Sequence, residues 1–270
     1  MKKRVVSGVI IGILILLIGV FNNPIIDILV IILLSMLGIY EYNKAFKKSG
    51  FRPISWIGYI GCLAIFGFSE FVTPESRLLI LKIAIPLLII SLFLYIILTK
   101  LKRTIVDIAI TVFGLLYIPF MFSFLKLILL MDTGRILILY VFAAAFASDT
   151  FAFLVGCKFG KHKLCPEISP KKTIEGAIGG VIGVVILFLI ITIISNTYFL
   201  MNYNILYMAI VGIVAGMAGQ LGDLSASAIK RYCNIKDFGN IIPGHGGILD
   251  RLDSLLFVGP VMYTFLILYS

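Results

Sequence analysis

Hydrophobic residues fall into long, nearly unbroken runs along this chain, separated by short polar segments. Each run is long enough for a helix to cross a hydrocarbon core of about 30 Å, which takes roughly 20 residues. The runs are continuous rather than alternating, and a backbone in lipid must satisfy its own hydrogen bonds, so helices are favoured over a barrel. The pattern predicts an all-α, polytopic integral membrane bundle of about nine transmembrane helices, over residues 4–21, 25–46, 55–71, 78–99, 104–131, 136–156, 174–195, 204–229 and 251–269.

The overall composition agrees with a membrane protein. The 270 residues are 61% hydrophobic and 13% charged, with a mean hydropathy of +1.13, against roughly 25% charged residues in soluble domains. The four cysteines have no CxxC spacing, and we expect them to have no role. The net charge of +10 is expected to serve topology and contact with anionic headgroups, so we expect membrane lipids and no nucleic acid as partners.

The distribution of lysines and arginines orients the predicted helices. Of the 23 cations, 19 fall in alternate connections counted from the amino terminus, and Arg77 and Arg135 alone fall in the others. The positive-inside rule therefore predicts a cytoplasmic N-terminus and, for nine spans, a C-terminus outside. The first run has no small-residue cleavage site and is expected to stay as an anchor. We expect a protein of the cytoplasmic (inner) membrane, with a transmembrane scaffold over residues 1–135 and a catalytic region with cytoplasmic loops over residues 136–270.

Two features of the first half leave alternatives open. Pro119 kinks one helix over residues 104–131 or divides it into two, and Lys126 either snorkels to the surface or faces an interior cavity. The acids of this half lie near predicted helix ends, where water is within reach, so we expect solvated caps and anchors without a catalytic role. They are Asp27, Glu41, Glu70, Glu75 and Asp107.

Charged and polar residues gather at a predicted cytoplasmic boundary between residues 147 and 183. Asp149 lies about two turns before the end of its helix, too deep for a casual surface acid. Lys172, Thr173 and Glu175 surround the start of the next helix, where free backbone amides favour a phosphate. The glycines that follow are more typical of close helix packing than of a ligand loop; they are Gly176, Gly179, Gly180 and Gly183.

Charge is also concentrated between residues 223 and 253, beyond what stability requires. Separations of four and seven residues place Asp223, Ser227 and Lys230 on one helical face, so that a carboxylate, a hydroxyl and an ammonium group point the same way. An ion pair between Asp223 and Lys230 alone is the structural alternative. The facing pattern recurs across the following loop, where Asp250 and Asp253 share one face of the last helix.

The loop between these helices contains the segment IIPGHGGILD. Its glycines around His245 allow unusual dihedral angles and a close approach to a bulky anion. Carboxylates without a cysteine or histidine cluster suit Mg²⁺, which commonly takes one or two carboxylates plus substrate phosphates. With the surrounding lysines and arginines, this set indicates phosphoryl or nucleotidyl transfer. The sequence contains no Walker A motif, Rossmann fingerprint or nucleophile elbow.

The segment SAIKRYCNIKDFGNIIPGHGGILDRLD resembles the signature of the phosphatidate cytidylyltransferases, also called CDP-diacylglycerol synthases. The FGKHK and SPKKTIEG segments are also similar to that family, so the resemblance covers residues 147–260 closely and the first half in hydropathy only. It implies that CTP and phosphatidic acid in the bilayer react to give CDP-diacylglycerol and pyrophosphate with Mg²⁺, in phospholipid biosynthesis. The positions of the signature are filled by Ser227, Lys230, Arg231, Lys236, Asp237, Pro243, His245, Gly246, Gly247, Asp250, Arg251 and Asp253.

The resemblance also implies roles for individual residues. The catalytic set is expected to be Asp223, Lys230, Arg231, His245, Asp250, Arg251 and Asp253. Within it, Asp223 and Asp250 are expected to hold the metal, and a second cation beside Mg²⁺ stays open. The substrate-binding set is expected to be Asp149, Lys172, Thr173, Glu175, Ser227, Lys236, Asp237, Gly246 and Gly247.

Two other functions fit the same residues. A related CTP-dependent enzyme acting on another lipid, such as a polyprenol kinase or an isoprenoid-lipid cytidylyltransferase, would use a similar site. A secondary transporter would also place acids within the membrane, but the charges here gather at one face and no inverted repeat is apparent. The glycine-rich helix faces permit a homodimer and do not require one.

Overall fold

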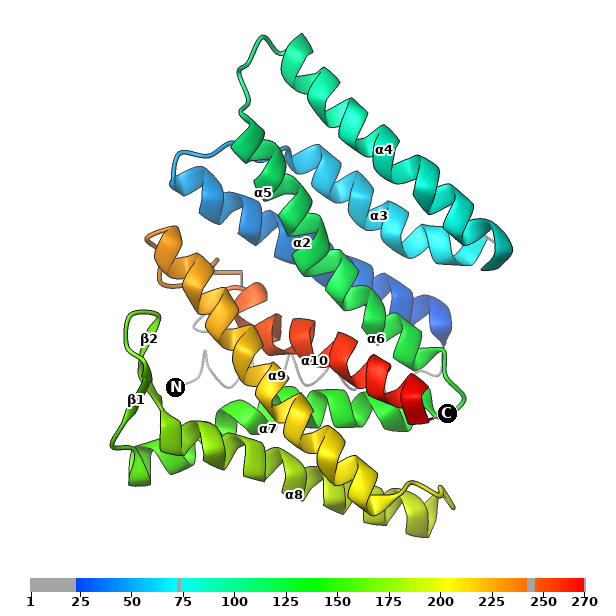
Figure 1. Ribbon diagram of the computed structural model, residues 1–270, viewed down its shortest axis with the longest axis vertical. Helices are drawn as coiled ribbons and strands as arrows, with labels where there is room; N and C mark the ends of the chain where they lie inside the picture. Colours follow the sequence, from blue (N-terminus) through cyan, green and yellow to red (C-terminus); the bar gives the residue numbers. More distant parts are fainter. Residues whose placement is uncertain (1–22, 72–73, 242–245, 270) are drawn as a thin grey trace.

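The computed structural model describes residues 23–71, 74–241 and 246–269, and Figure 1 shows an almost entirely helical protein. Its elements in chain order are α2 (Pro24–Lys48), α3 (Ser55–Phe71), α4 (Pro74–Leu98), α5 (Ile105–Leu115), the π-helical turn η1 (Leu116–Phe120), α6 (Met121–Leu129), α7 (Gly134–Phe159), β1 (Lys163–Cys165), β2 (Ser169–Thr173), α8 (Ile174–Tyr198), α9 (Ile205–Tyr232) and α10 (Leu249–Tyr269). The prediction of an all-α bundle is confirmed, apart from a short antiparallel hairpin of β1 and β2.

Six stretches of the described chain are long and apolar enough to cross a membrane, namely α2, the run from α5 to α6, α7, α8, α9 and α10. Helices α3 and α4 contain shorter apolar segments, at Ser55–Gly67 and Ile85–Leu98. Every predicted span from residue 25 onward therefore coincides with a helix. The span at 4–21 lies outside the described residues, so the count of nine and the orientation of the termini stay predictions.

Pro119 neither ends nor divides the helix in which it lies. Residues Ile105–Leu129 form one continuous helical run, and Pro119 lies inside the π-helical turn η1. Proline has no backbone N–H and its ring clashes with the preceding turn of an α-helix. The wider π turn gives the ring room, so residues 104–131 contain one locally widened helix rather than two.

Glycines bring α8 into close contact with its neighbours, as their spacing predicts. A Cβ atom on Gly179 would lie 2.5 Å from the Val155 side chain of α7, and one on Gly183 would lie 2.2 Å from the ring of Phe151. Gly216 of α9 faces the α8 backbone in the same way. Larger residues at the first two positions would separate α7 from α8, so the prediction of a packing face is confirmed.

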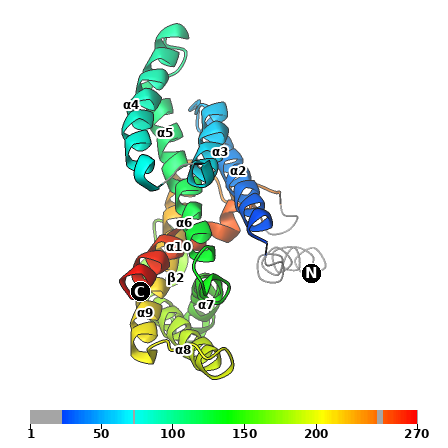
Figure 2. The ribbon, with the colours of Figure 1, turned by 90° about the vertical axis from the view of Figure 1, so that its right-hand side faces the viewer.

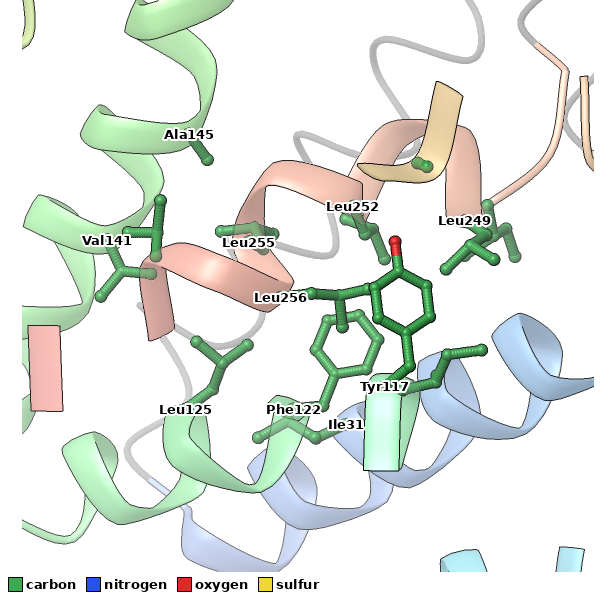
Figure 3. Close-up of a cluster of buried hydrophobic side chains, with 14 of the residues drawn as sticks. Ile31, Tyr117, Phe122, Leu125, Val141, Ala145, Leu249, Leu252, Leu255 and Leu256 are labelled. Carbon is green, nitrogen blue, oxygen red and sulfur yellow. The ribbon is translucent and has the colours of Figure 1, made fainter. Parts of the chain in front are cut away.

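Helix α10 packs between the two halves of the chain. Figure 3 shows Leu249, Leu252, Leu255 and Leu256 of α10 among buried side chains of α2, η1, α6 and α7. Figure 2 shows α3 and α4 extending away from this centre. Large apolar side chains along α4 are exposed, which suits a wall that faces lipid. The labelled partners of α10 in Figure 3 are Ile31, Tyr117, Phe122, Leu125, Val141 and Ala145.

Three acids of the first half are buried, so the expectation that they lie in water is wrong. Asp27, Glu41 and Asp107 are 3%, 0% and 3% exposed. Asp27 pairs with Arg135 across α2 and α7, Asp107 closes a capping box at the start of α5, and Glu41 reaches α10. Distance along a helix from its end does not reveal a neighbouring helix, so these partners are not evident from the sequence.

Lys126 is also buried, at 3% exposed, and donates a hydrogen bond to the Phe66 carbonyl of α3 at 3.2 Å. It therefore does not snorkel to the surface. The side chains of Glu70 and Glu75 lie outside the described residues.

Candidate active site

A cavity of about 440 Å³ lies between α7, the hairpin, the start of α8 and α9. Its walls combine charged, polar and apolar side chains, as a site for an amphipathic or nucleotide ligand requires. Four residues predicted for the site belong to it, namely Asp149, Lys172, Thr173 and Asp223. The complete lining is Asp149, Ala152, Phe153, Gly156, Cys157, Lys163, Leu164, Lys171, Lys172, Thr173, Gly176, Ala177, Gln220 and Asp223.

The hairpin brings Lys172 to this cavity, although the sequence predicts a loop there. The strands pair antiparallel with Lys163 opposite Thr173. Lys172 forms an ion pair with Asp223 of α9, and the two side chains are 22% and 24% exposed. Thr173 then caps α8 by accepting a hydrogen bond from the Gly176 amide at 3.1 Å. The ion pair therefore joins two elements and stays accessible from the cavity.

Two further sets of contacts hold the hairpin, one near its base and one at its turn. Glu175 accepts hydrogen bonds from the backbone amides of Lys161 and His162 at 3.1 and 3.2 Å, and its carboxylate lies 2.6 Å from the His162 ring. Arg231 donates to the Ile168 carbonyl in the hairpin turn at 3.1 Å. Glu175 is not among the residues that line the described cavity. Both side chains fix the position of the hairpin.

The polar face predicted on α9 divides between two partners. Ser227 lies 3.5 Å from the Asp223 carboxylate, in agreement with their spacing. Lys230 pairs with Asp250 of α10 at 2.6 Å, while Asp223 pairs with Lys172. The structural alternative, an ion pair between Asp223 and Lys230, is therefore not found. The two acids expected to hold the metal each have their own lysine.

Asp250 organises the loop that joins α9 to α10. One carboxylate oxygen pairs with Lys230, and the other accepts backbone hydrogen bonds from Phe238 and Gly247 at 2.8 and 3.0 Å. Gly246, with a φ of +91°, allows the turn just before. The side chains of Asp250 and Lys230 are 3% and 11% exposed. Because a buried charge that loses its partner is strongly destabilising, this pair holds the loop in one arrangement.

Three carboxylates approach one another where α7, α9 and α10 meet. Asp149, Asp223 and Asp253 lie within electrostatic range of one another. Asp253 is 4% exposed, whereas Asp149 is exposed. Lys172 and Arg251 lie within the same range of Asp149. The site therefore combines concentrated negative charge with cations that offset only part of it.

The donor chemistry of this region fits a hard cation such as Mg²⁺, which prefers carboxylate oxygens, because three aspartates lie within electrostatic range of one another. The buried hydroxyl of Tyr117 in η1, within electrostatic range of Asp223 and Asp253, has no hydrogen-bond partner among the described residues. Within the described residues, no three His, Cys, Asp or Glu side chains are grouped so that they could hold a metal ion. Metal binding by Asp223 and Asp250 therefore stays a prediction.

Other residues predicted for the site are exposed in the loop after α9 or in the first turn of α10. Lys236, Asp237 and Arg251 are exposed. Asp237 lies against Gly246, where an added Cβ atom would be 3.4 Å from that of Asp237. His245 lies outside the described residues. The roles predicted for these side chains stay predictions.

Sequence reasoning misses two residues at the site. Gln220 lines the cavity and donates to the Ala177 carbonyl at 2.8 Å, and nothing in its sequence context marks it. Glu41 accepts hydrogen bonds from backbone amides at the start of α10. Glu41 lies seven residues before Lys48, the last residue of α2, and this depth within a predicted span could have marked it in the sequence. The same criterion singled out Asp149.

Known proteins resemble this chain over its full length. Residues 2–269 match the cytidylyltransferase family. The phosphatidate cytidylyltransferase of Bacillus subtilis (strain 168) is 34% identical over 275 residues, which is 100% of this chain and 99% of that protein. That of Staphylococcus haemolyticus (strain JCSC1435) is 41% identical over 173 residues, 64% of each chain. That of Staphylococcus aureus (strain COL) is 34% identical over 245 residues, 89% of this chain and 90% of that protein.

These matches extend the likeness beyond residues 147–260 and into the first half of the chain, where the sequence alone indicates no more than a similar hydropathy. The cavity, its acids and its lysines lie in the part that carries the signature. The chain belongs to the cytidylyltransferase family, and its resemblance to the phosphatidate cytidylyltransferases is confirmed over its whole length.

Proposed function

We propose that this enzyme transfers the cytidylyl group of CTP to the phosphate of phosphatidic acid, giving CDP-diacylglycerol and pyrophosphate. The observation that carries the proposal is the accessible ion pair of Lys172 with Asp223, beside the cavity and within electrostatic range of Asp149 and Asp253. A lysine and several carboxylates at one place suit a phosphate and a cation together. The relatives are named for phosphatidate as their substrate.

The reaction is a displacement at the α-phosphorus of CTP. A phosphate oxygen of phosphatidic acid attacks, a new P–O bond forms, and the bond from the α-phosphorus to the oxygen that bridges to the β-phosphorus breaks. Pyrophosphate leaves with that oxygen. A phosphate monoester has a second pKa of about 6 and is largely ionised near neutrality, so no strong general base is needed. Catalysis is then mainly positioning and neutralisation of charge.

Three cationic side chains would share the neutralisation of the phosphate charge. Lys172 and Arg251, both within electrostatic range of Asp149, would meet phosphates in the cavity. Lys230, held by Asp250, would meet them at the loop. Lysine and arginine next to phosphate oxygens form strong charge-assisted hydrogen bonds, so these three side chains are suited to hold the two anionic substrates against each other.

Mg²⁺ would be held by carboxylates, with Asp223 and Asp250 as the predicted ligands and Asp253 beside them. When bound, it withdraws charge from phosphate oxygens and orients them. The unpartnered Tyr117 hydroxyl and the acid cluster support a polar ligand at this place. A second cation is compatible with the number of acids and is not needed for the proposal.

We infer that the cavity faces the cytoplasm at the inner membrane. The lysine-rich hairpin and the loop after α9 carry the charge that the positive-inside rule keeps in the cytoplasm, where CTP is dissolved. Phosphatidic acid would reach the same face from the bilayer. The contacts described here do not require a homodimer.

A comparison of lipid acceptors tests the proposal. Purified protein in phospholipid vesicles receives Mg²⁺ and CTP labelled at the α-phosphorus or, in a parallel reaction, at the γ-phosphorus, with phosphatidic acid, a polyprenol or a polyprenyl phosphate as the acceptor. We expect CDP-diacylglycerol that carries the α label from phosphatidic acid and no labelled lipid from the isoprenoids. If label appeared only in an isoprenoid lipid, the acceptor would be that lipid and not phosphatidic acid. Family membership sets the transporter alternative aside.

The metal assignment has its own test in the same assay. Asp223→Asn and Asp250→Asn each remove a predicted carboxylate ligand without changing the size of the side chain. We expect each to lower Mg²⁺-dependent turnover by about a hundredfold or more. Near-normal turnover of both variants would contradict the assignment.

A further inference from the structure

Glu41 is a buried carboxylate that connects the first half of the chain to the start of α10. It is 0% exposed. Its two oxygens accept hydrogen bonds from the backbone amides of Ile248 and Leu249, at 3.1 and 2.8 Å. Leu249 is the first residue of α10. Glu41 therefore satisfies amides that a helix start leaves unpaired, and it places negative charge at the positive end of the helix dipole.

Two glycines make room for this carboxylate. A Cβ atom on Gly239 would lie 2.3 Å from Glu41 Oε1, and one on Gly247 would lie 2.5 Å from Glu41 Oε2. Separations this short are well inside van der Waals contact. A larger residue at either position would displace the carboxylate or the loop, so the loop is fitted around Glu41 on two sides.

The same loop fixes Asp250. Consecutive backbone amides are divided between two carboxylates, because Gly247 donates to Asp250 while Ile248 and Leu249 donate to Glu41. A shift of the loop relative to α2 would therefore disturb both acids together. The Asp250 carboxylate in turn holds Lys230.

The first half of the chain contacts the end of α9 as well. Ser49, just after α2, donates to the Cys233 carbonyl at 3.1 Å, and the rings of Phe51 and Tyr232 stack with their centroids 6.1 Å apart. The loop after α9 is thus anchored to α2 at its beginning by these contacts and at its end by Glu41. The described residues at both ends of this loop are therefore tied to the first half of the chain.

We propose that Glu41 is a positioning residue for catalysis, which holds the loop and the start of α10 in the arrangement that places Asp250 at the predicted metal site and Lys230 at the reacting phosphates. The inference rests on the proposed function. Glu41 itself touches neither substrate, since it is fully buried and both of its oxygens accept backbone amides. It acts through Asp250.

Glu41→Gln tests this role, with Asp27→Asn as the matched control. Glutamine keeps the size of the side chain but offers one acceptor oxygen, so one backbone amide faces its NH₂ group. Because hydrogen bonds to charged groups are strong, we expect kcat per folded protein to fall about tenfold or more. Asp27 is a buried acid on the same helix, paired with Arg135. Its substitution is expected to lower the thermal midpoint and leave kcat per folded protein unchanged.

Wild-type kcat in folded Glu41→Gln would overturn the proposal. So would an equal loss of kcat per folded protein in the two variants, because the loss would then follow from removing any buried acid of α2 rather than from the contact of Glu41 with α10.

A pair of substitutions keeps the test decisive if Glu41→Gln does not fold. Gly239→Ala directs a methyl group into the carboxylate, whereas Glu41→Asp withdraws the carboxylate by one methylene group. We expect the activity lost through Gly239→Ala to be at least about threefold smaller in the Glu41→Asp background than in the wild type, because the two changes act on one contact. Equal losses in both backgrounds would contradict the role of Glu41.

Hydrogen exchange separates a failure of this inference from a failure of the proposed function. The amides of Ile248 and Leu249 should exchange faster in Glu41→Gln, or in Glu41→Asp, while exchange along α8 stays unchanged. Unchanged exchange at both amides would overturn the positioning role whatever reaction the enzyme catalyses. Wild-type protein that makes no CDP-diacylglycerol would overturn the proposed function and leave this measurement intact.

Discussion

The acidic side chains of this protein differ mainly in how much of each stays exposed when its partners are bound. Asp250 and Glu41 are buried and fully engaged, the first by Lys230 and two backbone amides, the second by two backbone amides. Such groups are costly to disturb, because a buried charge without its partner is strongly destabilising. Asp223 and Lys172 are also paired, but each keeps about a quarter of its side chain exposed. The accessible pair can exchange its partners for ligands, whereas Glu41 can hold the loop and the start of α10 in place.

Lys172→Met tests the accessible pair at the residue scale. The substitution removes the ammonium group that we expect to bind a phosphate, so kcat/KM for CTP should fall about a hundredfold. Lys158→Met is the control, because Lys158 is exposed near the end of α7 and contacts the ring of Phe159 rather than an acid. It should stay within about twofold of the wild type. Steady-state turnover of labelled CTP in vesicles measures both, and a Lys172→Met enzyme as active as the control would contradict this role.

Individual acids could be recognised from the sequence where depth in a span or spacing along a helix marked them. Depth marks Asp149, whereas spacings of four and seven residues to Ser227 and Lys230 mark Asp223, and both acids line the cavity. The ion-pair partner of Asp223 is not evident from the sequence, because Lys172 lies on another element. Glu41 carried the same signal of depth and went unrecognised, since helix ends near water suggest solvation and its partner amides lie on α10.

At the scale of elements, close packing of α7 and α8 defines one wall of the cavity. Gly179 and Gly183 of α8 leave no room for a side chain against Val155 and Phe151 of α7. The hairpin connects the end of α7 to the start of α8, so the packing of these two helices determines its position. The tight helix pair therefore determines where Lys172 is presented.

Gly183→Ala tests this packing. Its Cβ atom would lie 2.2 Å from the ring of Phe151, and overpacking of this kind typically costs about 1–3 kcal/mol. Gly67→Ala on α3 is the matched control, because an added Cβ atom there meets nothing within 4 Å and alanine favours a helix by roughly 0.5–1 kcal/mol over glycine. Thermal unfolding in detergent should show a lower midpoint for the first variant and an equal or higher one for the second. The reverse order would contradict the packing described.

Helices were predictable because each hydrophobic run is as long as a membrane span, and run length depends on sequence alone. The hairpin was not, since its two strands are too short for an alternating pattern to stand out and its residues read as a polar loop. The π turn at Pro119 is a third case. Proline marks a disturbance in a helix, but the packing around it decides between a break and a widened turn.

For the whole molecule, α10 ties the two halves of the chain together. It packs against α2 and α6 on one side and α7 and α9 on the other (Figure 1). The boundary expected at residue 135 is crossed by Glu41, which accepts hydrogen bonds from the amides of Ile248 and Leu249. Topology in the membrane remains a prediction, and it is the property of the whole molecule on which access of CTP depends.

Cys157 offers a test of that topology. It is exposed and lines the cavity, whereas Cys62 and Cys233 are buried, and burial raises the pKa of the Cys233 thiol, which lowers its reactivity further. In a Cys165→Ser background, a membrane-impermeant maleimide should label Cys157 in inverted vesicles and not in right-side-out ones. CTP with Mg²⁺ should slow the labelling. Modification from the outer face alone would contradict the cytoplasmic orientation.

The fate of two phosphates tests the central claim most directly. Purified protein in vesicles with phosphatidic acid and Mg²⁺ receives CTP labelled at the α-phosphorus in one reaction and at the γ-phosphorus in another. For cytidylyl transfer, the α label must appear in the lipid product and the γ label in pyrophosphate, and Asp223→Asn must lose both while Asp27→Asn keeps them. Transfer of the γ label to lipid would show a kinase instead and would contradict the reaction proposed here.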